Sequence, residues 1–484
     1  MAETSVPPTT VDEPDEGGLR RSITGKQLFF YTLGDVLGSG IYVLIGLVAA
    51  VVGGAFWIAF GVGVTIAAIT GTAYAELVTK YPQAAGAALY VNKAFRNKVL
   101  TFLITVCFLS ASFAAAGALA DGFSSYFATL WEGPPALLVT LLFIVVLSVV
   151  NFIGITESVV INMVMAFVEI AGLVIVLIIG IWFIAQGDAD FGVLTDFQSR
   201  NLDGDPVSPA LAILAGVALS FFAMTGFENT ANVAEETIDP HRNFPRSLIG
   251  GMITAGVIYV LVSMAAALTV PTDTLAGSGA ALLEVVEAGI LPIDTGFMST
   301  LFSVIACIAI TNTTLVAVVT QPRILYGMAN EDVVPGVFAK IHPTRRSPWV
   351  GLLFSGAVVC ALLVVGTLAP NVEDTPLIER LSLVTVLFLL LIYSLVIISC
   401  LKLRGQDEDE RTYRANTPLL IVGLLGNAAI LYWSIDDDPT SLIWCAGLVA
   451  VGVVLFLVEY LFGKRSRPPG VERGDPEAAD EKGV

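Results

Sequence analysis

Long, continuously apolar stretches follow one another along this chain and constrain its fold more than any other feature. Twelve of them approach or exceed the roughly 20 residues that an α-helix needs to cross a bilayer. Charged residues supply only 14% of the 484 residues, too few to cover the surface of a soluble protein of this length. The stretches do not alternate between apolar and polar residues, which excludes a transmembrane β-barrel. The sequence therefore predicts an all-α membrane protein.

The distribution of basic residues predicts how the chain crosses the membrane. With the N-terminus in the cytoplasm, all but two of the 24 Lys and Arg residues fall in cytoplasmic segments. The exceptions are Arg200 and Arg380. Because a missed or invented span would scramble this positive-inside pattern, we expect a multi-pass plasma-membrane protein with both termini cytoplasmic. The twelve predicted spans lie near 29–51, 55–78, 101–128, 135–152, 158–185, 209–233, 247–270, 296–322, 350–368, 380–401, 418–435 and 441–462.

Acidic residues outnumber basic ones, 42 to 24, and the net charge is −18. They crowd the predicted outer loops and both tails, 1–24 and 464–484, which we expect to be disordered. Such a surface either solvates the protein in high salt, as in halophiles, which we favour, or reflects acidic loops alone. All five cysteines fall within predicted spans, without metal-ligand or disulfide spacing. Nucleic acid is not expected as a partner, and the sequence does not indicate an oligomeric state.

Two predicted spans contain residues that interrupt a helix. Gly38-Ser39-Gly40 lies in the middle of the first span, and Thr225-Gly226 lies in the sixth. Because lipid cannot satisfy exposed backbone groups, such breaks persist only where they line a cavity or are covered by protein. Paired breaks in two halves of a membrane protein indicate a transporter binding site. The alternative is that these small residues only allow close contact between helices.

The separation of the two breaks by five spans predicts an internal repeat. Spans 1–5, about 25–186, and spans 6–10, about 207–404, would form two halves. Because five is odd, the second half crosses the membrane in the opposite sense, which gives an inverted five-plus-five repeat. The transporter core is then 25–404, and the two spans in 405–463 are additional helices.

The breaks offer groups of opposite charge to a ligand. After the first break, the free amides of residues 39–41 carry the positive end of a helix dipole and suit a carboxylate. At the second break, the carbonyls of Phe222, Ala223 and Thr225 are expected to lack helix partners and to suit an ammonium group. Together the two breaks predict a site for an α-amino acid.

The stretch 34–46, GDVLGSGIYVLIG, resembles the first-helix motif of the amino acid–polyamine–organocation superfamily, and its YVLxG portion resembles the cationic amino acid transporter branch. The stretches 73–86, 226–246 and 322–329 resemble further motifs of the superfamily, in order and at family-like spacing. The resemblance covers roughly 25–400 and implies a twelve-helix permease with alternating access. It places the carboxylate-binding loop on Gly38, Ser39, Gly40 and Ile41, and the amine-binding loop on Phe222, Ala223 and Thr225.

Other side chains near the breaks are further candidates. Phe222 and Phe227 either close over the substrate as gates or pack as ordinary core residues. Asn312, midway along span 8, either contacts substrate or bonds to another helix. Asp35 and Glu228 are weaker candidates, because Asp35 is expected near the cytoplasmic vestibule and Glu228 can simply cap a helix. We expect substrate near the membrane midplane, between spans 1, 3, 6 and 8.

Glu169 is the most informative single side chain, because it lies about 16 Å into span 5, near the midplane. A carboxyl group at that depth is costly and indicates a functional residue, and its helix face indicates the bundle interior. Many proton-coupled relatives in the superfamily have a lysine at the matching position. Glu169 either carries the transported proton, which we favour, or makes a hydrogen bond between helices as a protonated acid. A third possibility is a sodium site with oxygen atoms from Gly34, Leu37, Thr313 and Thr314.

These observations predict a secondary active amino acid transporter that works by alternating access, with proton symport favoured. Sodium symport and the exchange of amino acids or polyamines are the alternatives within transport. The alternative of another class is an amino acid sensor that binds without transporting. No cofactor or enzymatic activity is expected, because the spans contain no catalytic motif. The sequence does not indicate whether the substrate is cationic or neutral.

Overall fold

The computed structural model describes residues 21–83, 86–153, 159–200, 206–330, 333–345, 347–368, 376–406 and 409–462, without the side chains of 159–163. Within these ranges the regular secondary structure is helical, apart from two isolated β-bridges. Eleven helices are long and apolar enough to cross a membrane, and a bent pair of shorter helices brings the number to twelve. The predicted all-α class and number of spans are confirmed. The outer parts of both acidic tails, 1–20 and 463–484, lie outside the described residues.

Two of the twelve spans are discontinuous, at the places predicted from the sequence. Span 1 consists of α1 (Gly25–Val36) and α2 (Gly40–Val52), whose axes differ by 41°. Span 6 consists of α8 (Pro209–Ala223) and the 3₁₀ helix η3 (Phe227–Val233). The inverted relation between the two halves stays a prediction.

The other ten spans are, in order, α3 (Trp57–Lys80), α5 (Lys98–Leu130), α6 (Ala136–Ile153), α7 (Val159–Gln186), α9 (Pro240–Thr269), α12 (Thr295–Asn330), α13 (Trp349–Leu368), α14 (Leu377–Lys402), α15 (Thr417–Asp437) and α16 (Ser441–Phe462). Short helices in the connections are η1 (Gly54–Phe56), α4 (Gly86–Phe95), η2 (Phe191–Thr195), α10 (Thr272–Gly277), α11 (Ala281–Glu287) and η4 (Gly336–Ala339).

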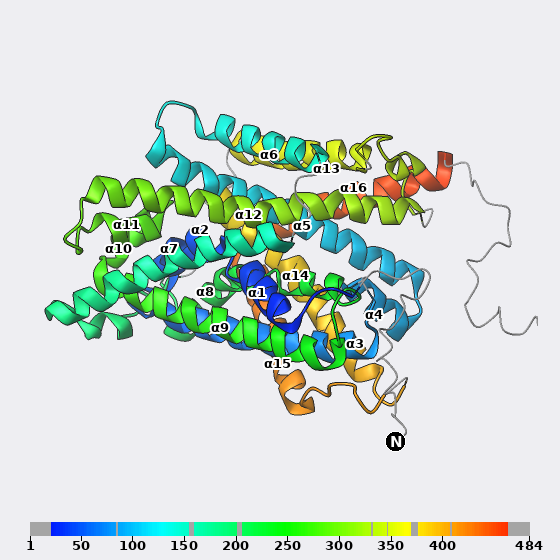
Figure 1. Cartoon of the computed structure of the whole chain (residues 1–484), viewed down its shortest axis with the longest axis horizontal. Coiled ribbons are helices and arrows are strands. Elements are labelled where there is room, and N and C mark those ends of the chain that lie inside the picture. Colours follow the sequence, from blue (N-terminus) through cyan, green and yellow to red (C-terminus); the bar gives the residue numbers. More distant parts are fainter. Residues whose placement is uncertain are drawn as a thin grey trace, which may run out of the picture.

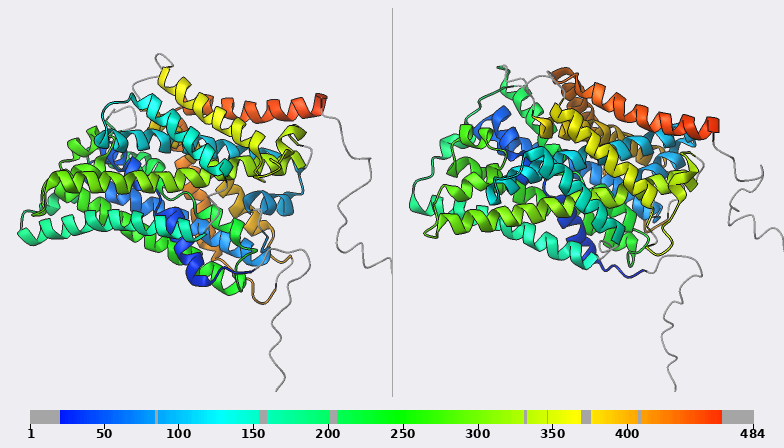
Figure 2. Two further views of the ribbon diagram at one scale, coloured as in Figure 1. Left: turned by 45° about the horizontal axis from the view of Figure 1, so that its top comes forward. Right: turned by 90° about the horizontal axis from the view of Figure 1, so that it is seen from above.

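The broken spans lie at the centre of the bundle, where α1 and α8 are surrounded by α9, α12 and α14 (Figure 1). α2 packs against α8, α1 against α9, and both α12 and α14 against α5. In α14, 78% of the most apolar stretch is buried, compared with 17% in α16. Accordingly, α16 runs along the outside of the bundle in both further views (Figure 2).

Two helices extend beyond the apolar stretches that predicted them. Span 8 was expected to end at Pro322, but α12 continues through this proline to Asn330. Span 7 was expected to start at 247, but α9 begins at Pro240, where a proline fits the first helical turn. Hydropathy marks only the part of a helix that lies in the hydrocarbon layer, so these polar extensions were missed.

A nearly buried ion pair joins span 2 to the segment after span 10. Arg404 donates from Nε to Oε1 of Glu76 at 2.9 Å and from Nη2 to Oε2 at 2.7 Å. The Ala415 amide donates to the same Oε2 at 2.8 Å, and Arg404 Nη2 donates back to the Ala415 carbonyl at 2.7 Å. Hydrogen bonding to Glu76 raises the pKa of the Arg404 guanidinium above its ordinary value. The pair therefore fastens the beginning of the α14–α15 connection to α3.

Candidate functional site

The first break interrupts the backbone hydrogen bonds of span 1. The ladder of α1 closes with the Leu37 amide on the Leu33 carbonyl, at 2.7 Å, and resumes with Val43 on Ser39, at 3.1 Å. Between them, the Ser39 amide donates to the Thr313 hydroxyl of α12 at 3.2 Å. The first turn of α2 thus presents amides that its own helix does not use.

Glycine is required at this break because neighbouring helices come too close to leave room for a side chain. A Cβ atom at Gly38 would collide with the Thr313 side chain, and one at Gly40 would collide with the backbone of Ala223. The sequence left two explanations for these glycines, a binding site or close helix contact. The structure has close contact here, and the contact brings the two breaks side by side.

The second break has a different local structure from the one expected. α8 ends at Ala223, and the chain turns at Gly226, whose φ of 113° favours glycine. The Phe222 carbonyl accepts from the amide and the hydroxyl of Thr225, at 3.1 and 2.8 Å. The Ala223 carbonyl accepts from the Tyr259 hydroxyl at 3.1 Å. The expectation of free carbonyls is therefore wrong for these two residues, because Thr225 of the turn donates to one and Tyr259 of α9 to the other.

Tyr259 of α9 connects the two breaks. Its hydroxyl donates both to the Ala223 carbonyl and to the Val36 carbonyl at the end of α1. The side chain is fully buried and packs edge-on against Phe60 of α3. No residue pattern in the sequence pointed to this tyrosine, since a single polar atom in an apolar helix has no distinctive spacing.

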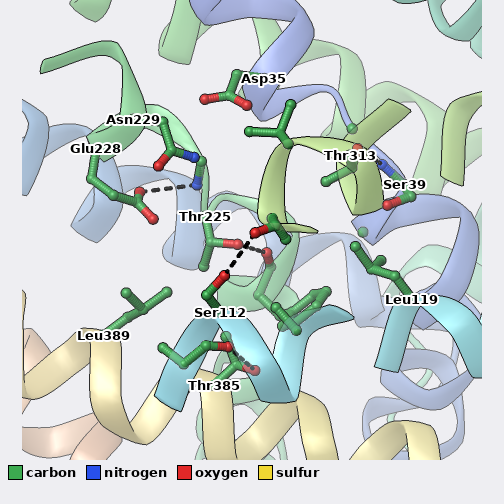
Figure 3. Close-up of a pocket in the computed structure, with 18 of the residues that line it drawn as sticks. Asp35, Ser39, Ser112, Leu119, Thr225, Glu228, Asn229, Thr313, Thr385 and Leu389 are labelled. Carbon is green, nitrogen blue, oxygen red and sulfur yellow. Dashed lines mark hydrogen bonds between the residues drawn. The ribbon is translucent and has the colours of Figure 1, made fainter. Parts of the chain in front are cut away.

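A cavity lies between the breaks and has a volume of about 80 Å³. This is room for roughly five to eight water-sized groups, comparable with the non-hydrogen atoms of a small amino acid. Figure 3 shows Ser39, Thr225 and Thr313 around it, with Ser112 of α5 and Thr385 of α14 on the opposite wall. Six residues predicted for substrate binding line it: Gly38, Ser39, Gly40, Phe222, Ala223 and Thr225.

The charge of the cavity comes from two acidic residues. Asp35 and Glu228 line it, and no basic side chain is among its described lining residues. Glu228 Oε2 accepts from the Gly226 amide at 2.9 Å and from the Tyr393 hydroxyl at 2.7 Å. Asp35 is 5% exposed, and its Oδ2 has no hydrogen-bond partner among the described residues. The cavity therefore favours a positively charged group.

Glu169 faces the protein interior, as predicted, and is fully buried. Its Oε1 accepts from Asn312 Nδ2 at 3.1 Å, whereas Oε2 has no partner among the described residues. Its backbone carbonyl accepts from the Tyr42 hydroxyl of α2 at 2.7 Å. Glu169 is not among the lining residues of the cavity, but Tyr42 connects it to α2, the second half of span 1.

Besides Glu169, four residues predicted for substrate, ion or gate are not among the lining residues of the cavity, and neither are Gly34 and Leu37 of the sodium alternative. Asn312 bonds to Glu169 instead, which is the second of its two expected roles. Phe227 is buried against Tyr74 and Tyr393, with ring centroids 5.6 and 5.0 Å away, and so packs as a core residue. The hydroxyl of Thr314 donates to the Ile310 carbonyl of its own helix at 2.7 Å. The fourth, Ile41, is buried in α2.

A family model for amino acid permeases matches residues 23–462. The chain belongs to the amino acid permease family. The permease is 25% identical over 470 residues to the methylthioribose transporter of Bacillus subtilis, covering 92% of this chain and 94% of that protein. It is 24% identical over 469 residues to the branched-chain amino acid permease BcaP of the same species, covering 93% and 92%. It is 27% identical over 423 residues to human cationic amino acid transporter 4, covering 82% and 62%.

The family match confirms a membrane transporter of the predicted superfamily rather than an enzyme. The permease cavity also has a wall that sequence reasoning missed. Substrate was expected between spans 1, 3, 6 and 8, but Thr385 and Leu389 of span 10 line the cavity too. The sequence signal that could have indicated this wall is the presence of hydroxyl groups within apolar spans. The signal is weak because such hydroxyls commonly bond to their own helix, as Thr385 does with Leu381 at 2.8 Å.

Proposed function

We propose that the permease is a secondary active transporter that binds an α-amino acid between its two broken spans. The observation that carries this proposal is the single cavity bordered by both breaks. The amides that begin α2 suit the substrate carboxylate. The acidic wall formed by Asp35 and Glu228 suits its ammonium group. The names of the similar proteins, which include a branched-chain amino acid permease and cationic amino acid transporters, support a substrate of this class.

Alternating access follows from the position of the cavity within the bundle. The cavity lies where two half-helices end, so small rotations at the breaks can open it to either side of the membrane. Phe222 lines the cavity at the end of α8 and is the proposed aromatic gate. Carboxylate binding is assigned to the amides of Gly40 and Ile41, because the Ser39 amide already donates to the Thr313 hydroxyl. Ammonium binding is assigned to the turn at Thr225 and to the acidic wall, because the Phe222 and Ala223 carbonyls already accept hydrogen bonds from other residues of the protein.

Coupling to protons through Glu169 is the favoured form of this transport. Its carboxyl group is fully buried and receives one donor, Asn312, which suits a group that takes up and releases a proton during the cycle. The sodium alternative has less support. The Thr313 hydroxyl already accepts from the Ser39 amide, the Thr314 hydroxyl donates within its own helix, and only Thr313 of the two lines the cavity.

The proposed setting is the plasma membrane, with both termini in the cytoplasm. The positions of the basic residues support this orientation. The acidic surface supports a protein that works in high salt.

Uptake of labelled amino acids into proteoliposomes, with proton and sodium gradients imposed separately, tests the proposal. Accumulation driven by the proton gradient is expected, and accumulation driven only by sodium would replace the proton by that ion. Counterflow without gradient-driven accumulation would identify an exchanger. Binding without any uptake would identify a sensor and overturn the proposal.

Glu169→Gln tests the coupling residue within the same assay. Gradient-driven accumulation should be lost while counterflow remains, because the variant keeps the cavity but cannot release a proton. Glu287→Gln, which removes an exposed carboxyl group outside the spans, is the matched control. Unchanged accumulation by Glu169→Gln would remove Glu169 from the coupling mechanism.

A further inference from the structure

Two carboxyl groups from different spans flank the turn at Gly226. Glu228 Oε2 accepts from the Gly226 amide at 2.9 Å. A Cβ atom built on the same residue, Gly226, would lie 3.4 Å from the carboxyl carbon of Asp35. Figure 3 shows Asp35 and Glu228 on either side of Asn229, next to this turn. Asp35 comes from α1 and Glu228 from η3, so the break in span 6 brings them together.

The two groups differ in how well they are satisfied. Glu228 has donors from Gly226 and from Tyr393 of α14, whereas Asp35 interacts with the Asn229 side chain and its Oδ2 is buried without a partner among the described residues. An ionised carboxylate in such a place is costly unless a cation or further donors accompany it. Asp35 and Glu228 also lie within electrostatic range of each other, and their negative charges repel.

Among the described residues, the titratable groups that act on the pair are acids and tyrosines. The titratable side chains that interact with Asp35 or Glu228 are Glu169 of α7, Tyr31 of α1, Tyr74 of α3 and Tyr393 of α14. The basic residue Arg323 of α12 acts on Tyr31, and its own side chain is exposed. The lining of the cavity contributes no Lys or Arg among the described residues. Two carboxyl groups in a desolvated site without a cation cannot both remain ionised.

We propose that Asp35 and Glu228 share one proton while the cavity is empty, which makes the pair a proton-binding site separate from Glu169. The pair then carries one negative charge, matched to one ammonium group. The proton comes from water in the cavity and returns to it, and no bond other than O–H forms or breaks. The identity of the ammonium group as that of an amino acid rests on the proposed function, whereas the shared proton does not.

Infrared difference spectroscopy of the full-length protein in liposomes tests the shared proton without any substrate. Glu169→Gln is the background, so that the buried acid of span 5 does not contribute. In this background, we expect a carbonyl-stretch band of one protonated carboxyl group that disappears as pH is raised. Absence of such a band would overturn the proposal, because both carboxyl groups would then be ionised together.

Two further substitutions distinguish a shared proton from a single isolated acid. With Asp35→Asn or with Glu228→Gln added, the band should disappear or titrate at lower pH, because the remaining carboxyl group has no like-charged neighbour. A band that keeps its midpoint in either variant would overturn sharing. Asp121→Asn is the control, since this half-buried acid of α5 is not among the residues lining the cavity, and it should leave the band unchanged.

Amino acid binding by the same preparations separates this inference from the proposed function. Titration calorimetry with L-leucine and L-arginine reports whether either binds. If neither binds and the band behaves as expected, the proton site stands and amino acid transport is in doubt. If binding occurs and the band is absent, transport stands and the shared proton is refuted. Should one single variant fail to fold, the other variant and the pH titration of the background protein still decide.

Discussion

Replacing Glu76 by glutamine should weaken the attachment of the α14–α15 connection to span 2. The Glu76 carboxylate accepts three hydrogen bonds, two from Arg404 and one from the Ala415 amide, at 2.7 to 2.9 Å. A glutamine keeps one oxygen, and its nitrogen cannot accept, so at least one of these donors loses its acceptor. Arg404 also loses its counter-charge, while its side chain is only 11% exposed.

The size of the effect follows from this burial. Removing one partner of a buried ion pair costs about 3–5 kcal/mol. Arg404 keeps its bond to the Ala415 carbonyl and lies near the end of the bundle, so we expect about 2–4 kcal/mol. Unfolding entropy grows with chain length, and a chain of this size should lose about 1–2 °C in Tm per kcal/mol. The expected loss is therefore about 2–8 °C.

The assay is the fraction of monodisperse protein after heating in detergent, measured at one heating rate because unfolding of such proteins is commonly irreversible. Glu76→Gln, Arg404→Gln and the double variant form a double-mutant cycle. The double variant should cost at least about 1 kcal/mol less than the sum of the single variants. Additive losses, or a Glu76→Gln protein within about 1 °C of the wild type, would refute the assignment of stability to this pair.

Three further outcomes follow from the contacts at the breaks. Gly40→Ala places a methyl group against the Ala223 backbone, which costs about 1–3 kcal/mol in overpacking. Amino acid binding should therefore weaken roughly tenfold. Unchanged binding in calorimetry would count against this contact. Tyr259→Phe removes the donor to the Ala223 and Val36 carbonyls and should lower stability by about 1–3 kcal/mol in the heating assay; an equal Tm would mean that these bonds do not form. Phe227→Ala should cost about 3–5 kcal/mol as a core residue, whereas a gate would instead change uptake at constant Tm.

The positions of the breaks and the interior position of Glu169 could be predicted from the sequence. Gly38-Ser39-Gly40 in an apolar stretch is a strong signal, because lipid tolerates a broken helix only where protein covers it. The interior position of Glu169 followed for a similar reason, since a carboxyl group in the hydrocarbon layer is driven away from lipid. Both features depend on local sequence and on the membrane as solvent, and neither requires knowledge of distant contacts.

The directions of side chains after the second break could not be predicted. The chain continues there as the 3₁₀ helix η3, whose period of three residues per turn places side chains differently from an α-helix. Phe227 consequently packs among aromatic residues, and Glu228 lines the cavity. Pairs distant in sequence were also out of reach, as with Glu76 and Arg404, which are separated by 328 positions.

The Tyr259 hydroxyl faces two carbonyl oxygens but carries a single hydrogen atom. At any instant it can complete a strong bond with only one of them, either at the end of α1 or at the end of α8. When one half-helix tilts away, the hydrogen can rotate toward the carbonyl of the other half-helix, so that the hydroxyl does not stay without a hydrogen bond. In the alternating-access cycle proposed above, the number of good bonds at this junction would therefore stay constant, which favours a low energy barrier between the two orientations.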